Sequence, residues 1–217
     1  MNTKQISWCT GLLNRLRFPL PDGQYLKLYE NNIRSLLDLK TSDEDWCFCV
    51  ADYESTDMNV DNFFVELQRE YGDKGVYFDY RTATIPQEKF TRGGARNEAY
   101  KLADFDTLFF LDADMLFTGR EVVESIYKHT HNGLAYFPVC LSYKNRAHTE
   151  HYQRNTGKGN VGLSRETYRL NTKGWFEKKT WGKEDDMIFD FYNNRKIVVR
   201  DCTGSFFHQW HPDQRSK

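Results

Sequence analysis

The sequence lacks the features of a membrane protein, a secreted precursor or a protein that coats nucleic acid. Its uncharged apolar runs, such as residues 108–111 near the middle of the 217-residue chain, fall far short of the roughly 20 residues that a spanning helix needs. Residues 1–5 contain no apolar signal-peptide core. The 30 Lys and Arg residues balance 31 Asp and Glu residues, giving a formal net charge of −1. We therefore expect neither a transmembrane segment nor a nucleic-acid partner.

Cysteine is scarce and odd in number. The 5 cysteines lie mostly in apolar segments, and without a signal peptide this usage is typical of reduced, buried thiols in a cytoplasmic protein. Cys47 and Cys49 are separated by one residue, which places both on one face of a strand and is not the spacing of a redox or zinc pair. The sequence therefore predicts a cytoplasmic location and no disulfide framework.

The chain does contain enough apolar material for one core. Hydrophobic residues make up 39% of it and charged residues 28%, with a mean hydropathy of −0.76. At a typical ~150 residues per domain, the length favours a single domain, and no repeat, low-complexity tract or linker divides it. Aromatic residues reach 16%, which suits a core and also allows stacking surfaces for sugars or bases.

Strand-like and helix-like segments alternate along the chain. Continuous apolar runs predict strands at residues 5–9, 46–51, 76–80, 107–111, 134–139 and 196–200. Helical spacing predicts helices at residues 25–37, 63–71, 93–102, 122–127 and 164–170, and another from Glu184 with Met187, Ile188 and Phe191 on one side. Residues 142–159 are polar and predict a mobile loop. This alternation predicts an α/β fold with a mostly parallel central sheet flanked by helices.

Two carboxylates follow the most strand-like run. Asp112 and Asp114 come at its carboxyl end, where ligands bind in open α/β sheets. Because they lie on the same side of an extended segment, they can converge on one Mg²⁺ or Mn²⁺ ion, with diphosphate oxygens completing its shell. The plain alternative is an acidic pair that only ends a strand in a turn.

Two further segments suggest chemistry near the C-terminus. His208 and His211 are spaced so that both imidazoles can reach one metal, particularly Mn²⁺, or else one packs in the core while the other is solvated. Trp181 precedes the acidic run of residues 184–186, offering a stacking plate beside a candidate general base. That segment also suits an ordinary helix N-terminus with favourable charges.

In chain order, these segments resemble the motifs of metal-dependent GT-A glycosyltransferases that use a nucleotide-sugar donor. The resemblance is to family-2-like enzymes with a β-1,4-galactosyltransferase-type C-terminal signature, also found in chondroitin-polymerase-like and polypeptide GalNAc transferases. It runs through most of the chain. It rests on residues 10–15, residues 52–57, Phe90 and Arg92 with Asn97, the DxD at 112–114, the WGxEDD at 181–186 and the HxxH at 208–211.

The resemblance implies a role for each matched residue. Donor contacts fall on Thr10, Gly11, Arg15, Asp52, Phe90, Arg92, Asn97, Asp112, Ala113 and Trp181. The ligands of Mn²⁺ or Mg²⁺ are Asp112, Asp114, His208 and His211, with Asp112 also suited to the ribose or to a water-mediated contact. Asp185 matches the catalytic base, Glu184 grips sugar hydroxyls, and Trp181 stacks on the acceptor sugar. Residues 159–162 resemble the loop below the donor sugar. Arg96 suits the diphosphate or a charge on a helix surface.

The implied protein is a single GT-A, Rossmann-like domain over residues 1–217. Residues 1–115 form its nucleotide-sugar-binding half and residues 116–217 its acceptor-binding half. It would transfer a sugar, from a UDP-sugar, to a glycan or other hydroxyl acceptor. One base opposite one metal-held leaving group implies inversion, and retaining GalNAc transferases carry Asn where this chain has Asp185. The missing stem and membrane anchor suggest a bacterial or viral enzyme, or a catalytic domain of a larger glycan-synthesising protein. The loop at 142–159 would close over the donor as a lid.

Three other functions stay open. The apolar strand before Asp112 resembles the nucleophile strand of haloacid-dehalogenase-type phosphatases, although its position in mid-chain and Leu116 argue against that class. A nucleotidyltransferase of related fold would carry a Gly-rich, basic loop after the first strand, which residues 10–15 match poorly. A non-catalytic sugar-binding protein of the same fold would not need the metal pair, the nucleotide-side residues and the base together.

Overall fold

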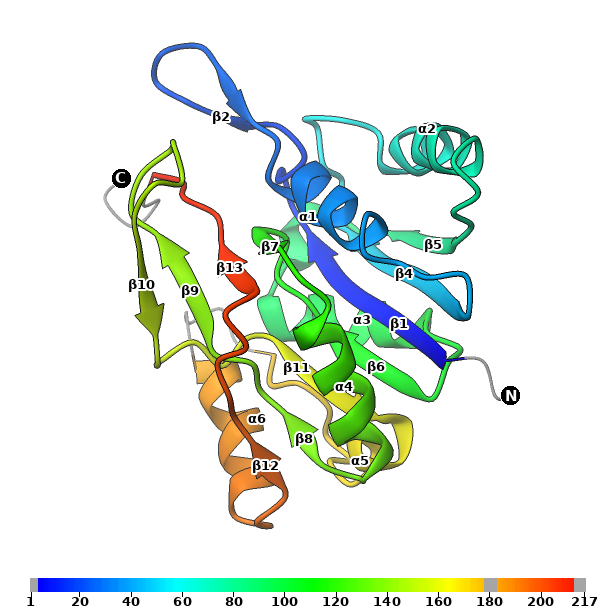
Figure 1. Cartoon of the computed structure of the whole chain (residues 1–217), viewed down its shortest axis with the longest axis vertical. Helices are drawn as coiled ribbons and strands as arrows, with labels where there is room; N and C mark the ends of the chain where they lie inside the picture. Colours follow the sequence, from blue (N-terminus) through cyan, green and yellow to red (C-terminus); the bar gives the residue numbers. More distant parts are fainter. Residues whose placement is uncertain (1–3, 178–182, 213–217) are drawn as a thin grey trace.

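A seven-stranded, mostly parallel sheet forms the centre of the molecule (Figure 1). The computed structural model describes residues 4–177 and 183–212. The strand order is β12-β8-β11-β6-β1-β4-β5, in which β11 alone runs antiparallel to both of its neighbours. The strands are β1 (Lys4–Leu12), β4 (Glu44–Asp52), β5 (Asp79–Thr84), β6 (Thr107–Phe110), β8 (Ala135–Tyr136), β11 (Val161–Ser164) and β12 (Val198–Val199). The predicted α/β fold is confirmed.

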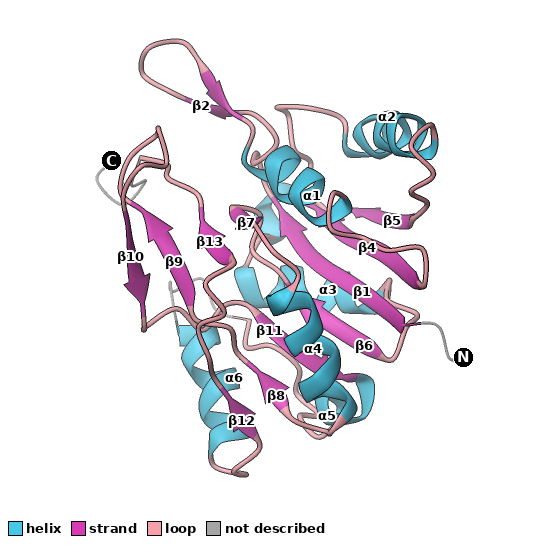
Figure 2. Ribbon diagram, viewed as in Figure 1, coloured by secondary structure: helices cyan, strands magenta, loops and turns pink. Residues whose placement is uncertain are grey.

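Helices cover both faces of this sheet (Figure 2). On one face, Trp8 and Phe109 pack with α1 (Leu28–Leu37), α2 (Val60–Gly72) and α4 (Glu121–His131). On the other face, Cys9 and Phe110 pack with α3 (Arg92–Lys101), α5 (Arg165–Arg169) and α6 (Lys183–Asn193). Successive strand residues point to opposite faces, so strands buried on both sides need the continuous apolar runs that the sequence shows.

A second, four-stranded sheet lies beside the first. Its order is β10-β9-β13-β7, built from β7 (Met115–Phe117), β9 (Cys140–Tyr143), β10 (His151–Arg154) and β13 (Phe206–His208). A small hairpin of β2 (Phe18–Pro19) and β3 (Tyr25–Leu26) follows β1, and a 3₁₀ turn, Gln87–Lys89, precedes α3. Because β7 and β13 come from distant parts of the chain, this sheet brings the segment after β6 next to the C-terminal segment.

Several predicted boundaries were wrong. The helix expected from residue 25 begins at Leu28, because Tyr25 and Leu26 pair with β2 instead. The strand expected at 76–80 is β5, three to four residues later. The segment 142–159 is no open loop, since it contains the end of β9 and all of β10. Met187 is 47% exposed rather than buried with Ile188.

Four of the five cysteines are buried, and the described helices are short or polar. Cys9, Cys47, Cys49 and Cys140 are buried free thiols, as predicted, but Cys202 is exposed. Within residues 4–177 and 183–212, no helix has the length and apolar character required to cross a membrane.

Candidate active site

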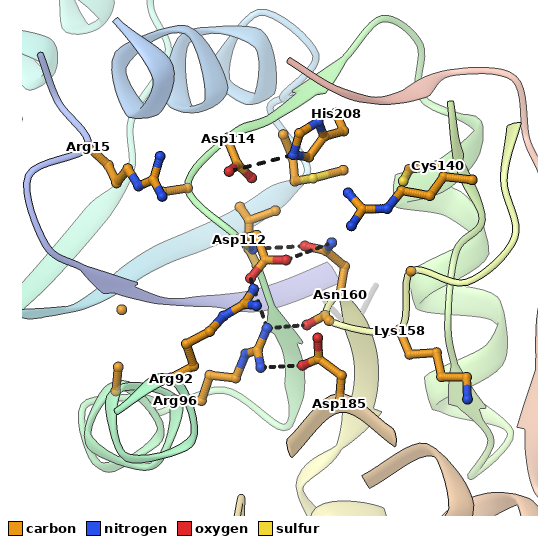
Figure 3. Close-up of a pocket in the computed structure, with 18 of the residues that line it drawn as sticks. Arg15, Arg92, Arg96, Asp112, Asp114, Cys140, Lys158, Asn160, Asp185 and His208 are labelled. Atoms are coloured by element: carbon orange, nitrogen blue, oxygen red, sulfur yellow. Dashed lines mark hydrogen bonds and ion pairs between the residues drawn. The ribbon is translucent and has the colours of Figure 1, made fainter. Parts of the chain in front are cut away.

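A pocket of about 670 Å³ opens at the carboxyl ends of β1 and β6 (Figure 3). Gly11 lines it from β1, and Asp112 and Asp114 line it from the segment between β6 and β7. His208 on β13 and Asp185 on α6 close the far side. Its volume lies within the roughly 300–1,000 Å³ typical of small-molecule sites.

Side chains from distant segments hold the acidic turn after β6. The backbone amide of Asp112 donates to Asn160 Oδ1 at 2.8 Å, and Asn32 Nδ2 donates to the Asp112 carbonyl at 2.9 Å. The Leu111 amide still donates to the Cys9 carbonyl, at 2.9 Å. These three backbone groups are therefore paired just after the end of β6, and both carboxylates line the pocket.

The close packing of α3 on β1 brings two arginines to the pocket. A Cβ atom at Gly11 would overlap the methyl group of Ala95 and lie 3.3 Å from its Cα, so the absence of a side chain there lets α3 approach. Arg92 and Arg96 lie one turn apart on α3 and therefore on one face, and both line the pocket.

Each of these arginines bridges two carboxylates. Arg96 Nη2 donates to Asp112 Oδ1 at 2.8 Å, and Arg96 Nη1 donates to Asp185 Oδ1 at 2.7 Å. Arg92 Nη2 donates to the same Asp112 oxygen at 3.2 Å, while Arg92 Nε lies 3.5 Å from Glu184 Oε1. Figure 3 shows the Arg96 guanidinium between the two aspartates. The network ties the turn after β6 to the first turn of α6.

The charges of the network keep Asp112 ionised. Burial favours its neutral form, but the guanidinium groups of Arg92 and Arg96 outweigh burial and hold the pKa of Asp112 below its usual range. Asp112 is therefore an arginine partner here. The structure does not bring it into the group of metal-ligand candidates around Asp114, and its role as a metal ligand stays a prediction.

Asp114, His208 and His211 converge on one point. Asp114 Oδ2 lies 3.2 Å from His211 Nε2 and 3.7 Å from His208 Nε2, and all three candidate ligand atoms are within 4.8 Å of one another. Burial disfavours the charged form of Asp114, but His208 and His211 reverse this and hold its pKa below its usual range. Burial lowers the pKa of His208, so its imidazole is neutral at pH 7 and offers a lone pair.

This group fits a divalent cation. His211 Nε2 is buried without a hydrogen-bond partner although it faces the Asp114 carboxylate, which suits a position turned toward a shared ion. Two imidazole nitrogens with one carboxylate oxygen favour Mn²⁺ over Mg²⁺, which prefers oxygen ligands.

The second sheet and Gln209 fix the spacing of these ligands. His208 pairs with Met115 across β13 and β7, and the Gln209 amide donates to the Asp114 carbonyl at 2.8 Å. The buried Gln209 side chain donates to the carbonyls of Leu28 and Met115, at 2.8 and 2.9 Å. The two histidines are thus held on either side of an anchored residue.

The structure brings most of the predicted site residues together. The pocket is lined by Gly11, Arg15, Phe90, Arg92, Arg96, Asp112, Ala113, Asp114, Gly159, Asn160, Asp185, His208 and His211. Thr10, Asp52, Asn97 and Glu184 do not line it. Trp181 lies outside the described residues, and its stacking role stays a prediction.

Most of the predicted residues outside the pocket have partners elsewhere in the fold. Asn97 Nδ2 donates to the Trp175 carbonyl at 3.0 Å, and its Oδ1 accepts from the Trp175 amide at 2.8 Å, so Asn97 is occupied away from the pocket. Asp52 accepts from the Ser55 amide at 3.2 Å, and Thr10 is 1% exposed. Glu184 is buried beside Arg92, and its contact with sugar hydroxyls stays a prediction.

Two basic residues in the pocket wall were not predicted from the sequence. Arg154 ends β10, and Lys158, in the turn before β11, lies 2.8 Å from Asp186. Both fall in the polar segment that we expected to be a loop. The sequence carries little signal for them, because a short edge strand with exposed side chains, such as β10, has little apolar pattern.

The comparisons with known proteins agree with this architecture. The family model described as glycosyl transferase family 2 matches residues 27–208. TarS 1–349 of S. aureus superimposes with a TM-score of 0.68 at 13% identity, covering 94% of this chain and 60% of TarS 1–349. The same protein in complex with UDP-GlcNAc gives a TM-score of 0.70 at 11% identity, covering 97% of this chain and 60% of that one.

A third structure, TarS 1–349 in complex with UDP, gives a TM-score of 0.67 at 13% identity, covering 96% of this chain and 61% of that one. This chain therefore spans about three fifths of the TarS fragment. At such low identity the likeness shows the fold, which is of the GT-A type. No curated protein sequence matches this chain.

Proposed function

Because the chain belongs to glycosyl transferase family 2, we propose that it transfers a sugar from a UDP-sugar to a hydroxyl acceptor in the pocket at the carboxyl ends of β1 and β6. The observation that carries this proposal is the meeting of three groups in one pocket. These groups are the ligand set around Asp114, the arginines of α3, and Asp185 at the start of α6.

The donor would bind at the carboxyl ends of the strands. Gly11, Arg15 and Phe90 line this side of the pocket, where backbone, guanidinium and aromatic groups suit a nucleotide. UDP and UDP-GlcNAc are bound to TarS 1–349, a protein of the same fold, which supports a uridine nucleotide here. The match of the family model favours this function over a haloacid-dehalogenase-type phosphatase.

Asp114, His208 and His211 would hold Mn²⁺, with Asp112 as a further candidate ligand. When bound, such an ion neutralises the charge that develops on a departing nucleoside diphosphate. The protein's own part is to keep His208 neutral and Asp114 ionised, so that both are ready to bind the ion at pH 7.

Asp185 is the proposed base. Its carboxylate lies at the pocket wall, with Oδ1 bonded to Arg96. Among the described residues, Asp185 Oδ2 has no hydrogen-bond donor, so it can accept the proton of an acceptor hydroxyl as that oxygen attacks the anomeric carbon. A single displacement of this kind inverts the configuration. Glu184 is buried against Arg92 and would act by holding that arginine.

The experiment is a UDP-release assay with a panel of UDP-sugars, Mn²⁺ and mixed glycan acceptors. Asp185→Asn should lower kcat by about 10²–10⁴-fold while leaving UDP affinity intact, because it removes the base but not the donor site. Asp190→Asn is the matched control, since Asp190 lies on α6 but is exposed and outside the pocket. Equal activity of Asp185→Asn and wild type would exclude Asp185 as the base.

A further inference from the structure

We infer that Arg96 is a positioning residue that orients the base Asp185 and fixes its distance from the donor side of the pocket. The inference rests on the proposed transferase function. It assigns Arg96 to the acceptor-side carboxylate and not to the diphosphate that its family resemblance suggests. Its evidence is the bonding of one buried guanidinium to groups from three separate segments.

Arg96 is almost fully enclosed, and its bonds are short. The side chain is 4% exposed. Nη2 donates to Asp112 Oδ1 and to the Gly159 carbonyl, both at 2.8 Å, and Nη1 donates to Asp185 Oδ1 at 2.7 Å. Both hydrogens of Nη2 are therefore used within the protein, and no donor on that nitrogen is left for a substrate phosphate.

The surroundings of Arg96 leave its guanidinium one orientation. Its Cζ lies 4.3 Å from the centre of the buried Trp175 ring, which covers the group. Gly159 packs against the hydrogen-bonded groups of Arg96 and the two aspartates. A Cβ atom at this position would lie 2.7 Å from Asp112 Oδ2, 2.9 Å from Arg96 Nη2 and 3.1 Å from Asp185 Oδ2. A side chain at residue 159 would therefore press on all three groups of the bridge between the two aspartates.

This arrangement selects which oxygen of the base reacts. With Oδ1 held by Arg96, the carboxylate of Asp185 cannot rotate freely, and Oδ2 is the oxygen available to the acceptor. The acceptor proton passes to Oδ2 as the new glycosidic bond forms and the bond to the diphosphate breaks.

Arg92 is placed differently. It pairs with Asp112 and Glu184 and adds positive charge near Asp185, whereas the ion pair of Asp185 within hydrogen-bond distance is with Arg96. The inference therefore predicts that Arg96 acts on turnover, whereas a diphosphate ligand would act on donor binding.

The experiment measures kcat, acceptor KM and UDP-sugar affinity for Arg96→Met and Arg96→Lys, with thermal denaturation to confirm folding. We expect Arg96→Met to lower kcat by about 10²-fold, as misplacing a catalytic group does, with donor affinity within about threefold of wild type. Arg96→Lys keeps the charge but cannot bridge both aspartates, so its kcat should lie between that of wild type and that of Arg96→Met.

A pair of glycine variants separates positioning from folding. Gly159→Ala should displace Asp185 and Arg96 and lower kcat by about tenfold or more. Gly157→Ala adds the same methyl group in the same turn, but its nearest neighbours lie at 3.7–3.8 Å, so its loss should be clearly smaller. Equal effects of the two variants would overturn the inference, as would a loss of donor affinity in Arg96→Met that matches its loss of kcat. If wild type releases no UDP from any UDP-sugar, the proposed function itself fails.

Discussion

Replacing Gly11 with alanine should move α3 off the sheet and carry Arg92 and Arg96 with it. A methyl group at position 11 would overlap the Ala95 methyl and would lie 3.3 Å from Ala95 Cα. Carbon–carbon contacts are ordinarily about 3.5–4.0 Å, so the helix must shift outward by roughly 1 Å. Because both arginines line the pocket from this helix, the change perturbs stability and function together.

Both effects have a definite size. Forcing an extra carbon into a packed core costs about 1–3 kcal/mol, so the free energy of unfolding of Gly11→Ala should fall by about 2 kcal/mol. At roughly 2–4 °C per kcal/mol for a chain of this length, Tm should fall by about 4–8 °C. A shift of about 1 Å in the arginines should lower kcat by about 10²-fold in the folded fraction.

A second substitution tests the cause. Ala95→Gly removes the methyl group that the new side chain would meet, at a cost of about 1 kcal/mol for glycine in a helix. Urea denaturation of both single variants and the double variant should show that the double variant is more stable than the sum predicts by about 1 kcal/mol or more. Additive losses, or a Gly11→Ala variant with the Tm of wild type, would refute this account of how α3 is placed.

Three further predictions concern the metal group, acid stability and Asn97. Mn²⁺ should raise the Tm of wild type but not of Asp114→Ala, and an equal shift in both would place the ion elsewhere. Burial raises the pKa of Glu44, but Arg120 and Thr41 outweigh burial and hold this pKa below its usual range. The ionised carboxylate therefore stabilises the fold fully above the unfolded pKa of about 4.3, and this stability is lost as pH falls through the lower folded pKa. Glu44→Gln should therefore cost about 3 kcal/mol at pH 7 and flatten the acid limb of stability against pH, whereas an unchanged limb would contradict it. Asn97→Ala should lower Tm while the folded protein keeps its UDP affinity, because its amide bonds to the Trp175 backbone; a lost affinity at unchanged Tm would restore a donor role.

The central strands could be predicted from the sequence because burial on both faces leaves a continuous apolar signature. β1, β4 and β6 fall where such runs occur, and the Ser164 side chain caps α5 as its position suggested. The second sheet could not be predicted in the same way. Strands such as β10, with mostly exposed side chains, have no apolar pattern, and pairing with β9 decides their structure.

The site residues also differ in how far the sequence could predict their contacts. Motif spacing pointed to Asp114 with His208 and His211, and the structure brings these three together. It did not show that Asn97 bonds to Trp175, 78 residues away in sequence, because a short motif does not show which contact a polar side chain will make. Arg96 is the instructive case, since only the fold shows that it faces Asp112 and Asp185 at once.

The most direct test of the central claim is a calorimetric titration of the whole chain with UDP and UDP-sugars in the presence of Mn²⁺, against ADP, CDP and GDP under the same conditions. We predict that UDP binds at least about tenfold more tightly than ADP, CDP or GDP, a difference of about 1.4 kcal/mol in binding free energy. We also predict that at least one UDP-sugar binds to the same site as UDP. Binding of no nucleotide, with or without Mn²⁺, would contradict the assignment of this pocket to a nucleotide-sugar donor.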